Sequence, residues 1–244
     1  MRALTTAEIL RICECGASAS RAERLLLLVS GACDDLPCEG LGKLTVGERD
    51  ARLFSLRAQI FGPQLDALCD CPACGQCAAL RFSAADVQGS QSADTPESLT
   101  LTQGDFKATF RLPIGLDLVR LNPHGDTAAN RLELLEQCLV AARHRGEEIS
   151  ARQLPEEVVM KIAERMAEAD PRADVQLALT CPQCGHRWTV PFDIAGFLWM
   201  ELSAFATRLL REVHELASAY GWSEADILAL SPQRRQVYLD LVRA

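Results

Sequence analysis

The stretch CPACGQC at Cys71–Cys77 recurs almost unchanged as CPQCGHRW at Cys181–Trp188. When the first cysteines of the two copies are aligned, Cys74 matches Cys184, a glycine follows each of them, and a phenylalanine stands 11 positions after each first cysteine. Residues 75–180 separate the two cysteine pairs. Because the match extends beyond the cysteines, it predicts two similar turn-and-strand units that are far apart in the sequence.

These two units have the chemistry of zinc-binding turns. In a CPxCG turn the glycine permits a left-handed backbone, and backbone amides face the two sulfurs and stabilise their negative charge. One turn supplies two thiolates, whereas a closed structural zinc site needs four ligands. We therefore expect Cys71, Cys74, Cys181 and Cys184 to bind one structural Zn²⁺ per chain, as a split zinc ribbon with a long insertion.

Three other interpretations fit the cysteine pairs less well. A thioredoxin-like redox motif opens a helix, whereas GHRWTVPF after Cys184 alternates like a strand. An iron–sulfur cluster could add Cys77, but the second copy has Arg187 at that position. A catalytic zinc needs an open coordination position, often beside a glutamate base, and neither HExxH nor HxE…PCxxC occurs. We therefore expect a structural site and a protein that is not an enzyme.

The remaining cysteines leave the assignment partly open. Cys69 and Cys77 flank the first turn and could replace a ligand, although the spacing favours Cys71 and Cys74. His186 could lie close to the metal, but a place on the surface of the turn is the simpler expectation. Free cysteine behaves as a small hydrophobic residue, which is the expectation for Cys138 on a leucine-rich helix and for Cys13, Cys15, Cys33 and Cys38, although these last four could form a second site.

Composition is that of an ordinary globular protein. Of 244 residues, 48% are hydrophobic and 24% charged, and the net charge is −8. Binding nucleic acid requires clustered basic residues, and the densest basic sites, 143–145 and 234–235, are small. The longest apolar run, Leu25–Val29, is too short to cross a bilayer, and Glu8 interrupts the start before a signal sequence could form. We expect a cytoplasmic protein without a membrane segment, and keep a nucleic-acid-binding zinc ribbon as the alternative function.

Periodicity predicts helices in the first part of the chain. Thr5 and Glu8 form a capping box before a helix that ends near Cys15. A leucine-rich helix over 21–31 and a third helix ending at Gly62–Pro63 follow. Beyond the first cysteine pair, AALRFSAADV begins like a strand, and the polar stretch 88–98 is expected to be a flexible loop.

The middle of the chain combines both kinds of element. LTLTQGDFKATFRLP at 99–113 predicts a β-hairpin, and LPIGLDLVRLN at 112–122 predicts a short helix or turn. Helices are expected over 128–145, with Leu132, Leu135 and Leu139 as the buried stripe, and over 154–171. A strand over 173–180 leads into Cys181.

The last part contains the longest predicted helix, from Asp193 to Tyr220, with apolar residues at steps of three and four. Gly221 ends it, Ser223 begins a short helix, and Ser231–Pro232 begin a final one. We therefore predict a mixed α+β fold that is mostly helical. Its expected parts are an N-terminal helical segment (1–68), the split zinc ribbon (69–192, with an insertion at about 86–173) and a helical C-terminal arm (193–244).

Several stretches resemble a known family. FDIAGFLWMEL at 192–202 and YGWSEADILALSPQRRQVYL at 220–239 are its most specific features, and VGERDARLFSLRAQIFGPQLDALCDCPACG at 46–75 and LPIGLDL at 112–118 also fit. They resemble the baseplate proteins of T-even-like phages, the hub assembly chaperone group, whose relatives occur with phage-tail-like contractile injection systems. The extra cysteines depart from this pattern.

The resemblance implies a non-enzymatic role in building a baseplate. The expected partners are hub, spike or other tail proteins in the bacterial cytoplasm, with incorporation into a tail-like particle left open. Tryptophan and arginine are common interface hot spots, so Trp199, Trp222, Arg234 and Arg235 are the predicted partner-binding residues. Tyr220 and Tyr238 are expected to pack within the arm.

Overall fold

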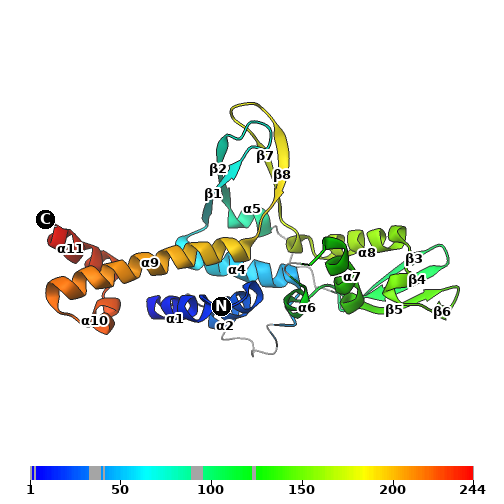
Figure 1. Cartoon of the computed structure of the whole chain (residues 1–244), viewed down its shortest axis with the longest axis horizontal. Coiled ribbons are helices and arrows are strands. Elements are labelled where there is room, and N and C mark those ends of the chain that lie inside the picture. The colour runs from blue at the N-terminus through cyan, green and yellow to red at the C-terminus, as the bar shows by residue number, and fades with distance from the viewer. Residues whose placement is uncertain are drawn as a thin grey trace.

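The computed structural model describes residues 2, 4–32, 40, 42–88, 96–122 and 125–243. Figure 1 shows an elongated molecule whose axis is the 27-residue helix α9 (Ile194–Tyr220). Two β-hairpins project from one side of the central helices, a lobe with a four-stranded sheet lies at one end, and two short helices lie at the other. The fold is mixed α/β and mainly helical, as expected. Cys33, Cys38 and residues 89–95 of the expected loop lie outside the described residues.

Three helices from the first quarter of the chain pack beside α9: α1 (Thr6–Gly16), α2 (Arg21–Ala32) and α4 (Val46–Phe61). A capping box begins α1, in which the Glu8 amide donates to the Thr5 hydroxyl (3.3 Å) and the Thr5 amide donates to the Glu8 carboxylate (2.8 Å). Thr45 and Glu48 form the same box before α4. Each box satisfies two amides that a helix start leaves unpaired. The three predicted helices are confirmed.

The main hydrophobic core joins these helices to α9. Leu53 and Leu56 of α4 pack in one cluster with Leu198 and Leu202 of α9, and all four side chains are inaccessible to solvent. This core therefore takes residues from the first and the last of the three expected parts. The boundaries at residues 68 and 192 stay a prediction.

An ion pair accompanies the core. The Arg57 side chain is 4% exposed and donates two hydrogen bonds to the Glu201 carboxylate, at 2.8 and 3.0 Å. It also donates to the carbonyls of Gly62 (2.7 Å) and Gln64. Removing one partner of a buried ion pair typically costs about 3–5 kcal/mol, because the remaining charge stays buried without compensation. Arg57 thus fixes the end of α4, and the strand that follows it, against α9.

The two projecting hairpins have the same design. In the first, β1 (Gln64–Asp70) pairs with β2 (Cys77–Ser83); in the second, β7 (Gln176–Thr180) pairs with β8 (Arg187–Pro191). Each cysteine turn connects the two strands of its hairpin. Strands β2, β7 and β8 confirm the predicted strands, and the short helix α5 (Ala84–Gln88) follows β2.

The inserted lobe has its own core. Phe110, Leu135 and Ile162 are buried in a cluster drawn entirely from residues 99–166. The elements of the lobe are β3 (Leu99–Gln103), β4 (Phe106–Phe110), α6 (Gly115–Arg120), α7 (Thr127–Cys138), β5 (Leu139–His144), β6 (Glu147–Glu148), η1 (Ala151–Gln153), α8 (Glu156–Ala169) and η2 (Pro171–Ala173). The sheet order is β3-β4-β5-β6, and the predicted β3–β4 hairpin is confirmed.

The helix predicted over 128–145 is wrong in its second half. Helix α7 ends at Cys138, and Leu139–His144 form strand β5, which pairs antiparallel with β4. Leu139 still packs against the lobe core, and Cys138 is fully buried as expected. The long-range pairing with β4 overrides the local helical pattern.

The C-terminal arm confirms the predicted helices. Gly221 adopts the left-handed conformation (φ 68°) that ends α9, and α10 (Glu224–Ala229) and α11 (Pro232–Arg243) follow. A small core of Val213, Leu216, Ile227 and Leu239 holds them against α9. Among the described residues, no helix combines the length and the apolar character that crossing a membrane requires.

A buried hydrogen bond between Gly47 and Asp170 is among the contacts that join the lobe to the central helices. The Gly47 amide, in the first turn of α4, donates to Oδ2 of Asp170 at 2.9 Å, and Asp170 is 5% exposed. A carboxylate at a helix N-terminus satisfies an unpaired amide and is stabilised by the helix dipole. A Cβ atom at position 47 would lie 1.8 Å from Oδ1 of Asp170. Only glycine fits at this position.

Gly47→Ala is therefore expected to break this contact and to lower the free energy of unfolding by about 2–4 kcal/mol, through overpacking and a buried carboxylate without its donor. Urea unfolding monitored by circular dichroism measures the loss. Gly115→Ala is the matched control, because its added Cβ would meet its nearest neighbour at 3.8 Å. Equal stability of the two variants would contradict this account.

Candidate metal centre

The two cysteine turns have the same backbone geometry. In the first, the Cys71 amide donates to the Gln76 carbonyl (2.9 Å) and the Gly75 amide donates to the Cys71 carbonyl (2.8 Å). The second repeats this pattern with Cys181 and His186 at 2.8 Å and with Gly185 at 3.0 Å. Gly75 and Gly185 have φ of 71° and 72°, the left-handed region that glycine enters without strain. The CPxCG sequence thus fixes the direction of both pairs of sulfurs.

The four sulfurs converge although they come from hairpins far apart in sequence. The Sγ atoms of Cys71 and Cys184 are 3.7 Å apart, as are those of Cys74 and Cys181. All four sulfurs lie within 4.8 Å of one another. A tetrahedral ion with metal–sulfur bonds of about 2.3 Å places its sulfurs about 3.8 Å apart. The four cysteines therefore fit a single tetrahedral ion.

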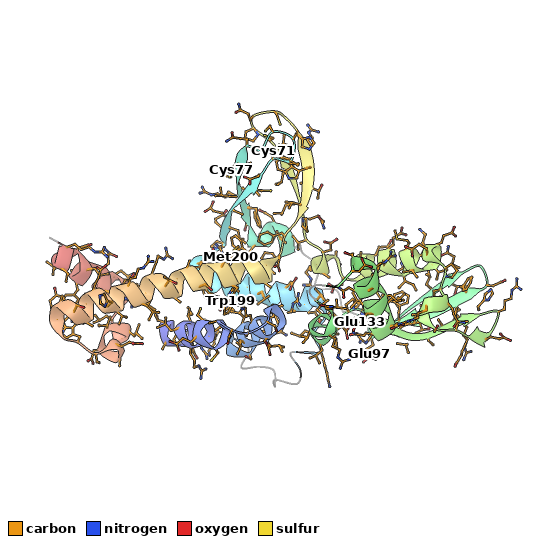
Figure 2. All side chains as sticks on the ribbon, viewed as in Figure 1. Cys71, Cys77, Glu97, Glu133, Trp199 and Met200 are labelled. Carbon is orange, nitrogen blue, oxygen red and sulfur yellow. The ribbon has the colours of Figure 1, made fainter. Side chains whose placement is uncertain are left out.

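Burial differs within each pair. Cys71 and Cys181 are 2% exposed, whereas Cys74 and Cys184 are exposed at the tips of the turns. Figure 2 places Cys71 at the far end of the hairpins from α9. The site is thus closed on the side of the hairpins and reachable from solvent on the other.

Without a metal, the crowded thiols titrate very differently. The Cys184 amide, followed by the Gln183 amide and the neighbouring thiols, lowers the pKa of Cys181 to about 7. The Gln76 amide favours the thiolate of Cys74, but hydrogen bonding with Cys184, burial and the other two thiols outweigh it and raise the pKa of Cys74 to about 12. A bound cation would allow all four cysteines to ionise, because it neutralises thiolates that otherwise repel one another.

The hairpins are also fixed at their base. Phe82 and Phe192, the equivalent phenylalanines of the two repeats, contact each other edge-to-face at 5.1 Å between ring centroids. Phe192 stacks on Phe54 of α4 (5.9 Å) and contacts Phe197 of α9 (5.3 Å). The repeated phenylalanine therefore joins the two units to the main core, while the cysteines meet at the opposite end.

The other cysteines do not join the four. Within the described part of the chain, Cys71, Cys74, Cys181 and Cys184 are the one group of three or more potential ligand residues whose ligand atoms converge. Cys69 and Cys77 lie on the strands beside the first turn, and His186 is exposed and stacks on Trp188. Cys13 is partly buried and Cys15 exposed, both on α1.

The predicted partner-binding residues lie in different surroundings. Trp199 is half-buried between α9 and the N-terminal helices, where the Arg24 guanidinium lies 4.9 Å from its ring centre. Trp222 is half-buried and stacks on Tyr220 at 4.7 Å. Arg234 is exposed, with its guanidinium 5.9 Å from the ring centre of Tyr238.

Arg235 requires a correction. The sequence predicts a surface residue, but the side chain is 4% exposed and donates to Glu212 of α9 (3.1 Å) and to the Leu230 carbonyl (3.1 Å). It holds α11 against α9 and is not available to a partner. Its place one residue after the exposed Arg234 explains the error, because adjacent helical residues face different sides.

Strand β1 is a feature that sequence reasoning missed. QLDALCD before Cys71 alternates buried and exposed residues, as does QLALT before Cys181. QLALT was predicted to be a strand. Because the two cysteine units repeat each other, the same prediction could have been made for QLDALCD.

Comparison with known proteins gives one match. The family described as T4 bacteriophage base plate protein matches residues 31–199, which include all four converging cysteines. No curated protein and no solved structure matches the chain. The family match covers more than half of the sequence and agrees with the resemblance of the stretches at 46–75 and 112–118. The chain belongs to the T4 bacteriophage base plate protein family.

Proposed function

We propose that this chain is a non-enzymatic assembly protein or chaperone for the baseplate hub of a contractile phage tail or a phage-tail-like injection system. It acts in the cytoplasm of the bacterial host by binding hub, spike or other tail proteins. One structural zinc holds its two hairpins together as a split zinc ribbon. The family match supports the baseplate context, and the convergence of the four sulfurs supports the zinc.

The four thiolate ligands favour a structural zinc over a catalytic one. Four thiolates at tetrahedral spacing use every coordination position of a zinc ion, so no position is left for a water or a substrate. A catalytic zinc keeps such a position open. Thiolate ligands favour zinc over magnesium or calcium, which prefer oxygen ligands.

Zinc in this place would add a link between the tips of two hairpins whose bases already pack together through Phe82 and Phe192. Apparent binding free energies of structural zinc are about 10–16 kcal/mol in zinc-finger peptides, as large as the stability of a whole domain. Because the hairpins precede and follow the inserted lobe, the ion would link the chain before the lobe to the chain after it, at the ends of the hairpins away from α9. A rigid frame of this kind suits a protein that presents surfaces to several tail components.

The purified protein is expected to contain one zinc per chain, and Cys184→Ser is expected to lose it and to become sensitive to protease. Elemental analysis measures the metal, and limited trypsin digestion measures the sensitivity. Cys77→Ser is the matched control, because Cys77 is an exposed cysteine on the same hairpin system outside the four. If Cys184→Ser melts and digests like the wild type, zinc does not hold the hairpins together.

Zinc affinity is expected to fall as the pH is lowered, because the ion must displace protons from the thiols. Cys181, with a pKa of about 7, is already ionised above that pH, whereas Cys74, with a pKa of about 12, still carries its proton. The number of protons displaced per ion therefore increases by about one as the pH falls below 7. Competition with a chromogenic chelator between pH 6 and 8.5, in several buffers, measures this slope. A pH-independent affinity would count against thiolate ligation.

The assembly role predicts that the tagged protein co-purifies with a hub or spike protein when the neighbouring tail genes are co-expressed. An unrelated tagged bait is the control. Deleting the gene is expected to stop baseplate assembly. Mass spectrometry of finished particles shows whether the protein remains in the baseplate, as a component would, or is absent, as a chaperone would be. The role is refuted if the protein binds no hub, spike or wedge subunit and baseplates assemble normally without it.

A further inference from the structure

The first hairpin has an open strand edge. Strand β1 pairs with β2 alone, and the bond from the Cys71 amide to the Gln76 carbonyl fixes the alternation of their hydrogen bonds. By this alternation Cys69 and Ala67 bond to β2, whereas the amides and carbonyls of Asp66, Leu68 and Asp70 point to the opposite side. In the part of the chain that the structure describes, no hydrogen bond engages the Leu68 backbone.

The side chains along this edge are unusual for an open strand. Leu68 is 74% exposed, the most of any large apolar residue among those described. Asp66 and Asp70 lie two positions to either side, on the same face, and both are exposed; the Asp66 carboxylate also pairs with Arg81 of β2 at 2.6 Å. An unpaired edge with an exposed leucine is a template for another strand, and charged flanking residues restrict which strands can pair with it.

A cavity adjoins the same strand. It has a volume of about 560 Å³ and lies between the inner faces of the two hairpins, with Leu80 on one side and Leu177 and Val190 on the other. Ala67, Leu68 and Cys69 of β1 line it, and α9 contributes Trp199 and Met200, the latter 64% exposed. Figure 2 shows Trp199 and Met200 on α9 at the base of the hairpins. Side chains of a strand added beside β1 would alternate between this cavity and the outer face.

The charges beside Leu68 distinguish two strands that could pair with the open edge of β1: the β1 strand of a second copy of this chain, and a basic segment of another protein. If β1 of a second copy paired antiparallel around Leu68, Asp66 would lie opposite Asp70 of the second copy, and this would occur twice. Like charges directly opposite each other destabilise a sheet. A strand with lysine or arginine at these two positions and an apolar residue opposite Leu68 would instead be stabilised.

We propose that the outer edge of β1 binds an extended segment of another protein by strand addition. The segment has the pattern basic–x–apolar–x–basic, with apolar x side chains that enter the cavity. Main-chain hydrogen bonds supply affinity and the alternating side chains supply specificity. The inference depends on the proposed function only for the source of the segment, a tail protein.

The test uses the full-length zinc-loaded protein and two synthetic peptides, acetyl-TKLVLKT-amide and its acidic counterpart acetyl-TELVLET-amide. Fluorescence anisotropy is expected to show binding of the basic peptide at least about tenfold tighter than of the acidic one, and amide hydrogen exchange is expected to slow at Leu68 and Asp70. Asp70→Lys is expected to weaken binding of the basic peptide and to strengthen binding of the acidic one.

Two proline variants separate edge pairing from general adhesion. Leu68→Pro removes the outward amide without removing a bond to β2, and is expected to weaken binding about tenfold or more. Ala79→Pro makes the same change directly across the hairpin, on the other edge, and is expected to bind like the wild type.

Three results would overturn the proposal: no peptide binding up to about 1 mM, equal weakening by both proline variants, or unchanged exchange at Leu68 and Asp70 in the wild-type protein. Because no tail protein takes part in this assay, its failure leaves the co-purification result intact. The exchange measurement does not depend on how well either proline variant folds.

Discussion

The convergence of four sulfurs at the tips of two hairpins is the constraint on which the architecture depends. Cys74 and Cys181 are separated by the whole inserted lobe, yet their sulfurs lie 3.7 Å apart. Four thiols at this distance repel one another when ionised and cannot all be ionised near neutral pH without a cation. The four thiolates are therefore unfavourable without a cation, and the same arrangement is suited to binding a cation with two positive charges.

A second constraint acts at the other end of the hairpins and does not need an ion. The contacts of Phe82 and Phe192 with each other and with Phe54 join both hairpins to the core, and Arg57 fixes the start of β1. The hairpins therefore meet at the tips and at the base, and a stretch of each hairpin lies between these two points. The cavity beside β1 occupies this stretch. If the four cysteines hold an ion, as proposed above, its loss would free the tips while the base stayed in place.

Sequence reasoning succeeded where the decisive interaction is local. The capping residues Thr5 and Thr45, the terminating Gly221 and the long apolar period of α9 all act within a few residues of their own helix. The association of the two cysteine pairs is long-range, but ligand number made it predictable, because one CPxCG turn provides half of a closed site.

The errors fall where distant segments decide the structure. Residues 139–144 continue the helical pattern of the sequence. They form a strand because their backbone pairs with β4 through hydrogen bonds. No local signal marks Gly47 as the neighbour of Asp170, which lies 123 residues away. Arg235 was assigned to the surface because its contact, Glu212, belongs to another helix.

The placement of the basic residues favours protein partners over nucleic acid. Three of the four arginines at the densest basic sites are paired within the fold: Arg143 and Arg145 approach Glu148 and Asp105 at 3.6 and 2.8 Å, and Arg235 is buried against Glu212. A phosphate backbone would have to displace these carboxylates before it gained any charge neutralisation. In a chain with a net charge of −8, the edge proposed above to bind a basic segment carries the exposed carboxylates of Asp66 and Asp70, of which Asp66 pairs with Arg81. Binding of a basic segment at this edge, as proposed above, would fit the tail or baseplate partners that membership of this family suggests.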